Sequence, residues 1–325
     1  DGVLMIEDHT LSVRRLQCEG NSEWNLYGTP MSPMLIPYWT QDSHESMEGL
    51  YFESSLTTPF HFINSSEMSL NASNPIPGLR YNNFQLERGL KHLDLYGVSY
   101  YVNITPEAGQ AADELESMTK IAESGPFGIF ALPETQLVEA AEFVPSVYEV
   151  PERGPLAALI GSETVIGADG EPLPSFHDMA LQWYDDVDNL DLWVVADGPE
   201  SWPRIESLDE REAVPTGAPE DAVSDISFDD HRISFHTEAV GVPHLVKMSY
   251  FPNWEATGAD GPFRATPSLM VVVPTAEDVV IEFNDTWAET GGKVLTVLGV
   301  LALVAVVVAI EVRRRRGQRT DGASS

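Results

Sequence analysis

The apolar positions of this chain change period along its length. Leucines at near-helical spacing from Leu86 onward end at Gly97 and predict a short helix, and the run Val98–Ile104 that follows predicts a strand. Residues 106–123 place apolar side chains near helical spacing and predict a second helix. Two more apolar runs predict strands, at 128–132 and 137–143. Residues 86–150 are therefore expected to form a compact α/β unit.

The flanking segments have other patterns. Residues 1–85, rich in Pro, Ser, Asn and aromatic residues, predict short strands and long ordered loops, and residues 151–225 predict an irregular connection. Residues 226–290 hold β-rich runs separated by Gly and Pro turns, at 233–237, 244–251, 268–273 and 279–283. Antiparallel strands in such succession favour a β-sandwich-like part. The predicted fold class is α+β, with a small α/β unit and a β-sandwich-like ectodomain.

The pattern ends in an apolar run, residues 294–312, which is long enough for a helix to cross the hydrocarbon core of a membrane. A basic tail at 313–325 follows, with four consecutive arginines from Arg313 to Arg316. By the positive-inside rule the tail is cytoplasmic, so the body is expected outside the cell membrane. Since the sequence opens at Asp1 without an export signal, we expect either a removed signal peptide or upstream transmembrane helices in the same polypeptide.

Charge narrows the function classes. The 325 residues include 51 Asp and Glu against 18 Lys and Arg, a formal net charge of −33. Such a surface suits a halophilic environment, where salt screens the self-repulsion, although an acidic surface without that purpose is the alternative. The charge argues against nucleic acid as a partner. Cys18 is the single cysteine, which excludes an intramolecular disulfide and a cysteine-based metal cluster.

Few residues suggest chemistry, and neither a catalytic residue nor a cofactor is predicted. The carboxylates of Asp185, Asp186, Asp188 and Asp191 could ligate calcium, although the run lacks the Gly and Glu of an EF-hand, and a solvated acidic cluster is the alternative. Aromatic residues could stack on sugars or belong to the core. The two glycan-stacking candidates are Trp39 and Trp254.

Four N-x-S/T sequons could carry N-linked glycans on an exported domain. Their asparagines are Asn64, Asn71, Asn103 and Asn284. Asn103 lies in an apolar run and is followed closely by Pro106, which makes it the weakest candidate.

Six segments, spread over most of the chain, carry a resemblance to a known family. They are 35–40, 46–55, 57–62, 96–101, 249–254 and 267–275. Together they resemble the C-terminal extracytoplasmic region of multi-spanning GT-C-type or YfhO-like putative glycosyltransferases of archaea and actinobacteria, some of which are labelled 6-pyruvoyl-tetrahydropterin synthase-related. In GT-C enzymes the catalytic acid lies in an early extracytoplasmic loop, so the resemblance transfers no catalytic residue to this chain. The pterin label finds no support, because no H-x-H pair occurs here.

The resemblance implies an accessory, non-catalytic extracytoplasmic domain of a membrane-embedded glycosyltransferase-like protein. Its expected partners are the lipid bilayer, a glycan or lipid-linked sugar, and upstream helices of the same protein. The alternative is a structural type I cell-surface glycoprotein without enzymatic activity. A third hypothesis is an ectoenzyme that uses the carboxylates from Asp185 to Asp191 with a metal ion.

Overall fold

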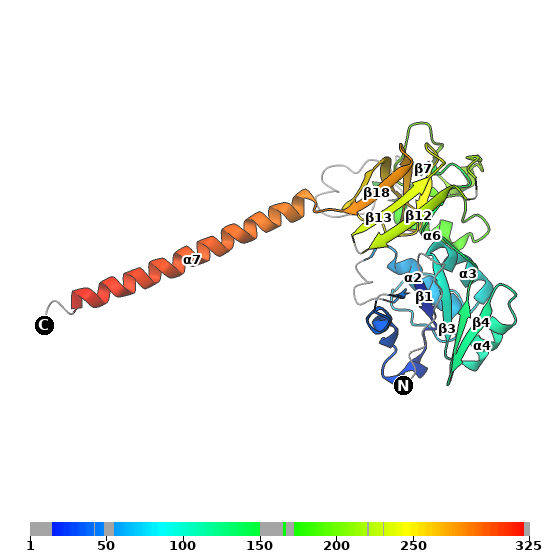
Figure 1. Ribbon diagram of the computed structural model, residues 1–325, viewed down its shortest axis with the longest axis horizontal. Coiled ribbons are helices and arrows are strands. Elements are labelled where there is room, and N and C mark those ends of the chain that lie inside the picture. Colours follow the sequence, from blue (N-terminus) through cyan, green and yellow to red (C-terminus); the bar gives the residue numbers. More distant parts are fainter. Residues whose placement is uncertain are drawn as a thin grey trace.

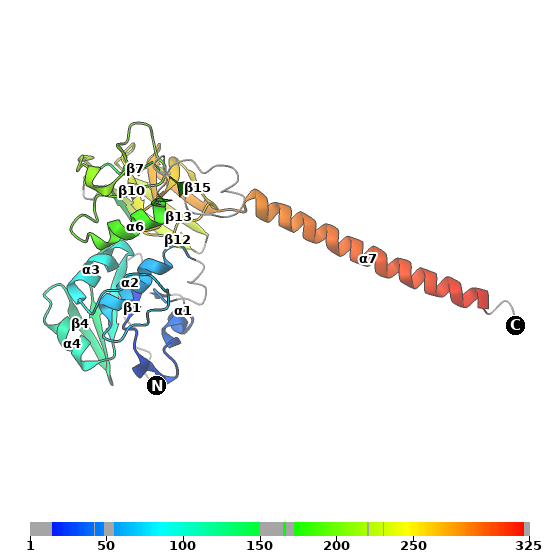
Figure 2. The ribbon, with the colours of Figure 1, turned by 180° about the vertical axis from the view of Figure 1, so that it is seen from behind.

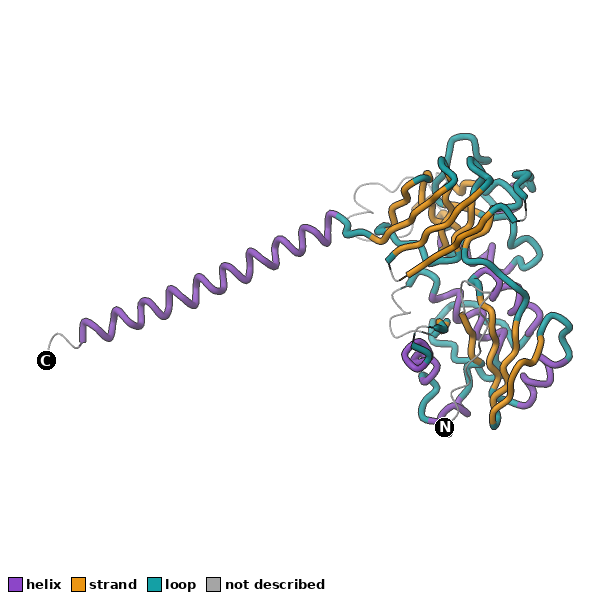
Figure 3. The backbone as a smooth tube through the Cα atoms, in the orientation of Figure 1, coloured by secondary structure: helices purple, strands orange, loops and turns teal. Residues whose placement is uncertain are grey.

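The structure is a computed structural model that describes residues 15–41, 43–48, 55–149, 165–166, 172–219, 221–229 and 231–321. Figure 1 shows a mixed α/β body with several sheets, from which one long C-terminal helix extends. The strands gather in two groups, one below the other (Figure 3). We call the lower group, with its helices, the N-terminal unit and the upper group the C-terminal unit.

A five-stranded sheet forms the centre of the N-terminal unit, in the order β2-β1-β3-β5-β4. Its strands are β1 (Arg15–Cys18), β2 (Glu45–Ser46), β3 (Val98–Asn103), β4 (Thr119–Ser124) and β5 (Phe127–Ala131). β1 pairs in parallel with β2 and β3, while β5 is antiparallel to β3 and β4. All residues of the central strand β3 are buried, including the polar Ser99 and Asn103, as expected for a strand covered on both faces.

Three helices accompany this sheet: α2 (Thr58–Met68), α3 (Leu86–Leu95) and α4 (Pro106–Asp113). α3 ends as the sequence predicts, because Gly97 has a φ of +61°, which a side chain would disfavour. α4 begins with Thr105, whose hydroxyl accepts a hydrogen bond from the Ala108 amide, and with Pro106 in the first turn.

The C-terminal unit contains a seven-stranded sheet in the order β11-β7-β10-β16-β17-β14-β6. Its strands are β6 (Val138–Ala140), β7 (Ser146–Tyr148), β10 (Val194–Val195), β11 (Arg204–Ile205), β14 (His244–Val246), β16 (Ala259–Ala265) and β17 (Leu269–Pro274). A four-stranded sheet, β12-β13-β18-β15, has the strands β12 (Val223–Asp229), β13 (Arg232–Thr237), β15 (Trp254–Thr257) and β18 (Asp278–Phe283). Leu137, Met270 and Ile281 share one hydrophobic cluster, so side chains from both sheets meet in it.

The remaining elements are short, except α6. They are the 3-10 helices η1 (Ser22–Tyr27), η2 (Ser32–Leu35) and η4 (Leu208–Glu210), the helix α1 (Ile36–Trp39), the hairpin strands β8 (Val165–Ile166) and β9 (Pro172–Leu173), and α6 (Phe176–Asp185). α6 lies between the C-terminal sheets and the helices α2 and α3 in both ribbon views (Figures 1 and 2). The largest hydrophobic cluster runs through this junction, with Phe60, Leu93 and Trp183 among its fully buried members.

Several predicted elements are confirmed, among them α3, β3, β5, β13 and β18, and three predictions are wrong. The helix predicted over 106–123 ends at Asp113, and β4 begins at Thr119. The strand β6 belongs to the C-terminal sheet rather than to an α/β unit of residues 86–150. The segments 1–85 and 151–225 also contain the helices α2 and α6, and β1 pairs with β3 across the expected boundary at 85.

The C-terminal helix α7 covers Trp287–Asp321. Within Trp287–Ile310, an 18-residue window reaches a mean hydropathy of 2.8 and none of that window is buried, so by length and composition the helix could span a membrane. The apolar helix expected at 294–312 is therefore present and starts earlier, at Trp287. Figure 2 shows it projecting away from the body as a single rod.

Candidate functional site

A cleft of about 1350 Å³ lies where the N-terminal and C-terminal units meet. One wall comes from α3 and the loop after α4, with Leu90 and Glu116 among its residues. The other comes from β6 and the loop that follows α6, with Glu139 and Asp191. A second hollow of about 510 Å³ shares Glu87 and other lining residues, so the depression continues along α3.

Carboxylates dominate the polar lining of this cleft. They belong to Glu87, Asp94, Glu114, Glu116, Glu139, Glu142, Asp188 and Asp191. Among the described residues of the lining, Lys91 is the one that is basic, and its ammonium lies 2.7 Å from a carboxylate oxygen of Asp188. The cleft is therefore strongly negative and offers many hydrogen-bond acceptors.

The floor of the cleft is apolar. Leu90, Leu95, Leu190 and Trp193 contribute to it, and Trp193 is nearly buried, with 6 % of its surface exposed. The Trp193 ring packs on Trp183 with centroids 5.2 Å apart. An apolar floor beneath a polar rim is the usual form of a small-ligand site.

A buried lysine stands behind the cleft. The side chain of Lys247 is 1 % exposed, and its ammonium lies 2.9 Å from Glu139, 3.4 Å from Asp94 and 2.8 Å from the Thr135 hydroxyl. Burial raises the pKa of the Glu139 carboxyl, while the adjacent Lys247 opposes that rise. These contacts join α3 to β6 across the two units and hold both carboxylates at the edge of the cleft.

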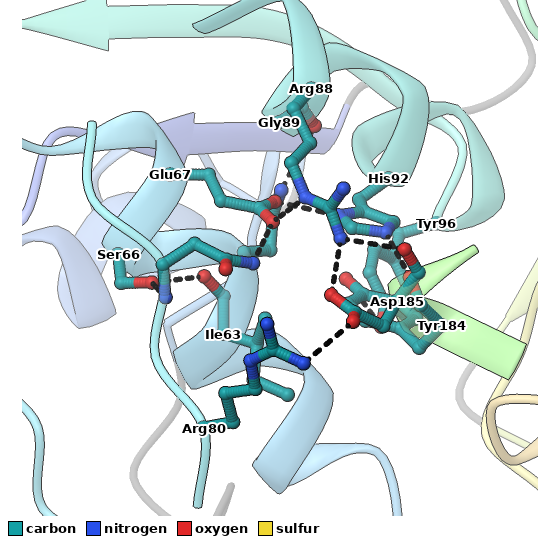
Figure 4. Close-up of polar contacts among 12 residues, drawn as sticks. Ile63, Ser66, Glu67, Arg80, Arg88, Gly89, His92, Tyr96, Tyr184 and Asp185 are labelled. Atoms are coloured by element: carbon teal, nitrogen blue, oxygen red, sulfur yellow. Dashed lines mark hydrogen bonds and ion pairs between the residues drawn. The ribbon is translucent and has the colours of Figure 1, made fainter. Parts of the chain in front are cut away.

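A second polar network joins α3 to α2 and α6 (Figure 4). The carboxylate of Glu67, on α2, is completely buried. It accepts hydrogen bonds from Arg88 Nε and Asn82 Nδ2, both at 2.8 Å, and contacts His92 Nδ1 at 2.6 Å. Burying a carboxylate costs free energy unless it is paired, and here both of its oxygens have donors.

His92 connects this carboxylate to α6. Its Nε2 lies 2.8 Å from the Tyr184 carbonyl oxygen, and its ring stacks on the Tyr184 ring with centroids 3.7 Å apart. Both ring nitrogens of His92 therefore face hydrogen-bond acceptors. Arg88 extends the link, with Nη2 2.8 Å from Asp185. The network therefore fixes α6, and with it the loop that forms one wall of the cleft.

The carboxylates predicted as metal candidates form ion pairs with different basic side chains. Asp185 pairs with Arg80 and Arg88, Asp186 with Arg211, and Asp188 with Lys91. The hydrogen bond from Arg211 lowers the pKa of Asp186. Among the residues that the structure describes, no group of three His, Cys, Asp or Glu side chains could hold a metal ion. Asp188 and Asp191 instead line the cleft.

The two predicted glycan-stacking tryptophans have different surroundings. Trp39, in α1, is 51 % exposed, so its ring is accessible. The prediction for Trp254 is wrong, because it is 8 % exposed, packs edge-on against Phe283 with centroids 5.1 Å apart and belongs to the core of the C-terminal unit. A ring that fills a core has no free face for a sugar.

The predicted sequons also divide by accessibility. Asn64 is fully buried in α2 and donates from Nδ2 to the Gly89 carbonyl oxygen at 2.9 Å, and Asn103 is buried in β3. Neither side-chain amide can be glycosylated in the folded protein, so these two candidates are wrong. Asn71 and Asn284 are exposed.

Sequence reasoning missed Glu67, His92, Arg88 and Lys247. Arg88 and His92 lie one turn apart on α3, but Glu67 precedes His92 by 25 positions, Lys247 follows β14 in the other unit, and no motif joins them. The sequence offered one signal for them, which is an ionisable residue next to a strongly apolar run. Lys247, directly after the strand β14, is an example.

Comparison with known proteins finds no relative of this chain. Neither a family model, nor a curated protein, nor a solved structure matches the chain.

Proposed function

We propose that this chain is the extracytoplasmic, non-catalytic domain of a membrane-embedded glycosyltransferase-like protein, and that its cleft binds a glycan. The observation that carries the proposal is the cleft of about 1350 Å³ with its acidic rim and apolar floor. The link to glycosyltransferases rests on the sequence resemblance to GT-C-type and YfhO-like proteins.

The chemistry of the cleft suits a neutral sugar. Ionised carboxylates accept hydrogen bonds from hydroxyl groups, and sugars carry hydroxyls in adjacent pairs that such oxygens can bind. The apolar floor around Leu90 and Leu190 can pack against the C–H face of a pyranose ring. A diphosphate would be repelled by these carboxylates. The proposal is therefore that the glycan portion of a lipid-linked sugar, and not its phosphate, occupies the cleft.

The remaining features agree with this location. The apolar part of α7 would anchor the domain, and the arginines that follow it favour a cytoplasmic tail. The charge of −33 fits a halophilic cell surface, where concentrated salt screens the carboxylates. We also propose that the C-terminal unit is β-sandwich-like, which is supported by the hydrophobic cluster that Met270 of one sheet shares with Val279 and Ile281 of the other.

The test is glycan binding by the full chain in detergent micelles. Neutral oligosaccharides prepared from the cell surface are screened by saturation-transfer NMR in concentrated KCl, and affinities follow by titration. The variant Glu116→Gln/Asp191→Asn removes two exposed cleft carboxylates, and we expect affinity to fall by at least about tenfold, since each hydrogen bond to a charged group contributes about 1.5–3 kcal/mol. The control Glu200→Gln/Glu212→Gln alters exposed carboxylates outside the cleft lining. Binding unchanged in the cleft variant would exclude this site.

A second candidate function is a structural type I cell-surface glycoprotein, which the exposed sequons at Asn71 and Asn284 favour. Polypeptide size separates the two hypotheses. An antibody against the tail after Arg316 should detect, in deglycosylated native membranes, a band far above 35.8 kDa if upstream membrane helices belong to the same protein. A band near 35.8 kDa would favour the glycoprotein.

A further inference from the structure

One segment of this acidic chain has almost no charge. Between residues 21 and 41 the sequence contains a single charged side chain, Glu23, although the protein as a whole carries 51 acidic residues. The segment forms η1, η2 and α1. Six of its large apolar side chains are exposed to solvent, and they are Leu26, Tyr27, Met31, Leu35, Tyr38 and Trp39. Three of the six are aromatic, namely Tyr27, Tyr38 and Trp39, and we call the whole set the aromatic face.

The aromatic face is held in place by the sheet beneath it. Trp24 donates from Nε1 to the Glu19 carbonyl oxygen at 2.8 Å and packs on Phe127 of β5, with ring centroids 5.0 Å apart. Tyr27 contacts the same Phe127 ring edge-on at 4.9 Å. Ile36 of α1 packs on the same hydrophobic cluster as Trp24, while Tyr38 remains 78 % exposed and Trp39 51 %. Exposed apolar side chains on an ordered support are typical of an interaction surface.

The position of this face relative to α7 indicates its partner. In Figure 2, α1 lies at the edge of the N-terminal unit on the side toward which α7 projects, and β4 lies at the opposite edge. Trp287, where α7 leaves the body, is 88 % exposed. Tyrosine and tryptophan concentrate at the level of the lipid headgroups, where one end of the ring is apolar and the other is hydrated.

We propose that the aromatic face docks on the headgroup layer of the same membrane that α7 enters. The inference rests on the anchoring of α7 in a membrane, which is part of the proposed function. A protein surface this rich in carboxylates is repelled by anionic lipid, and the charge-poor segment from 21 to 41 is a place where contact costs little electrostatic energy. Docking at this second point holds the body at a fixed tilt over the bilayer, whereas a single helix would let it rotate.

The test uses the full chain in vesicles of phosphatidylcholine and phosphatidylglycerol in concentrated KCl. Tyr38→Cys places a thiol in the aromatic face for an environment-sensitive fluorophore, and the matched control is Ile121→Cys on β4, where Ile121 is 42 % exposed. The native Cys18 is buried, and burial raises the pKa of its thiol, so it will not take up the label. Shallow spin-labelled lipids then report contact with the membrane.

We expect quenching at position 38 to be at least about twofold stronger than at position 121, with blue-shifted emission. Equal quenching at both positions in chains that float with the vesicles would overturn the docking and leave the anchoring intact. Failure of the chain to float would overturn the anchoring and the docking together. Emission at position 38 that shifts to the blue as protein density increases, without lipid quenching, would assign the face to a second copy of the chain and also overturn the proposal.

Discussion

The buried carboxylate of Glu67 allows the sharpest prediction about stability. Its side chain is completely buried, and its oxygens lie within 2.6–2.8 Å of donors on Asn82, Arg88 and His92. Glu67→Gln keeps the size of the side chain and removes its charge. One of the two acceptor oxygens becomes an NH₂ group, which must face a donor on Arg88, Asn82 or His92.

The expected cost follows from these contacts. Removing one partner of a buried ion pair leaves an uncompensated charge and costs about 3–5 kcal/mol. Arg88 is 19 % exposed and keeps its contact with Asp185, so part of its charge remains compensated. We therefore expect Glu67→Gln to lower the free energy of unfolding by about 3 kcal/mol. The control Glu200→Gln, at an exposed position, should stay within about 0.5 kcal/mol of the wild type.

The assay is urea unfolding of the full chain in detergent, monitored by the fluorescence of the buried tryptophans. The dependence of the free energy of unfolding on urea concentration must be the same in all variants. The double variant Glu67→Gln/Arg88→Met should lose less than the sum of the two single losses, since it removes both charges. Because the pair is buried, the loss from Glu67→Gln should persist in concentrated KCl. A loss below about 1 kcal/mol, or additive single losses, would show that Glu67 and Arg88 do not act as a coupled buried ion pair.

Three further predictions concern the cleft, its supporting loop and the sequons. Lys247→Met should lower the free energy of unfolding by about 1–2 kcal/mol in urea titrations. This is less than the loss expected for a fully buried ion pair, because the carboxylate partners of Lys247 reach solvent. A loss near zero would show that Lys247 does not stabilise the junction between α3 and β6. Arg211 lowers the pKa of Asp186, so this contribution is complete above the unfolded pKa of about 4 and is lost as the pH falls through the lower folded pKa. The stability difference between wild type and Arg211→Met should therefore shrink below about pH 4 in thermal melts, and a constant difference would show that the charge pair is not its source. Peptide mapping of native protein should find glycan on Asn71 and never on buried Asn64.

The elements that the sequence predicted best are those in which one face is buried. Leu86 and Leu93 lie on the buried side of α3, and Gly97 ends that helix, so periodicity and turn chemistry agree. α2 was missed because nine of its eleven residues are buried, which leaves no polar stripe to reveal a helical period. Polar residues inside it, such as Asn64, made the segment resemble a loop.

The wrong extension of the helix over 106–123 has a different cause. Leu115 and Met118 both pack toward the core from the turn after α4, in which the Met118 amide donates to the Leu115 carbonyl oxygen, so their spacing resembles that of a helix. Ile121, counted in the same pattern, lies on β4 and is 42 % exposed. Spacing alone could not separate a buried turn and an edge strand from a helix.

The candidate site was less accessible to sequence reasoning than the fold. Asp188 and Asp191 were singled out as possible metal ligands, yet their relation to Glu116 and Glu139 depends on how β6 crosses into the C-terminal sheet. Pairing between distant strands is set by tertiary packing, which local pattern does not encode. The cleft could therefore be recognised only after the two units were placed together.

The sidedness of the body is the most direct test of the proposed function, since a glycan-binding extracytoplasmic domain must lie outside the cell. A membrane-impermeant maleimide is applied to intact cells that express one of two variants. Ile121→Cys places a thiol on β4, where Ile121 is exposed, and Ser325→Cys places one at the end of the basic tail. Both variants retain the native Cys18, which is buried. We predict labelling of Cys at position 121 in intact cells and labelling at position 325 only after the membrane is opened. The reverse pattern would place the body in the cytoplasm and contradict the account.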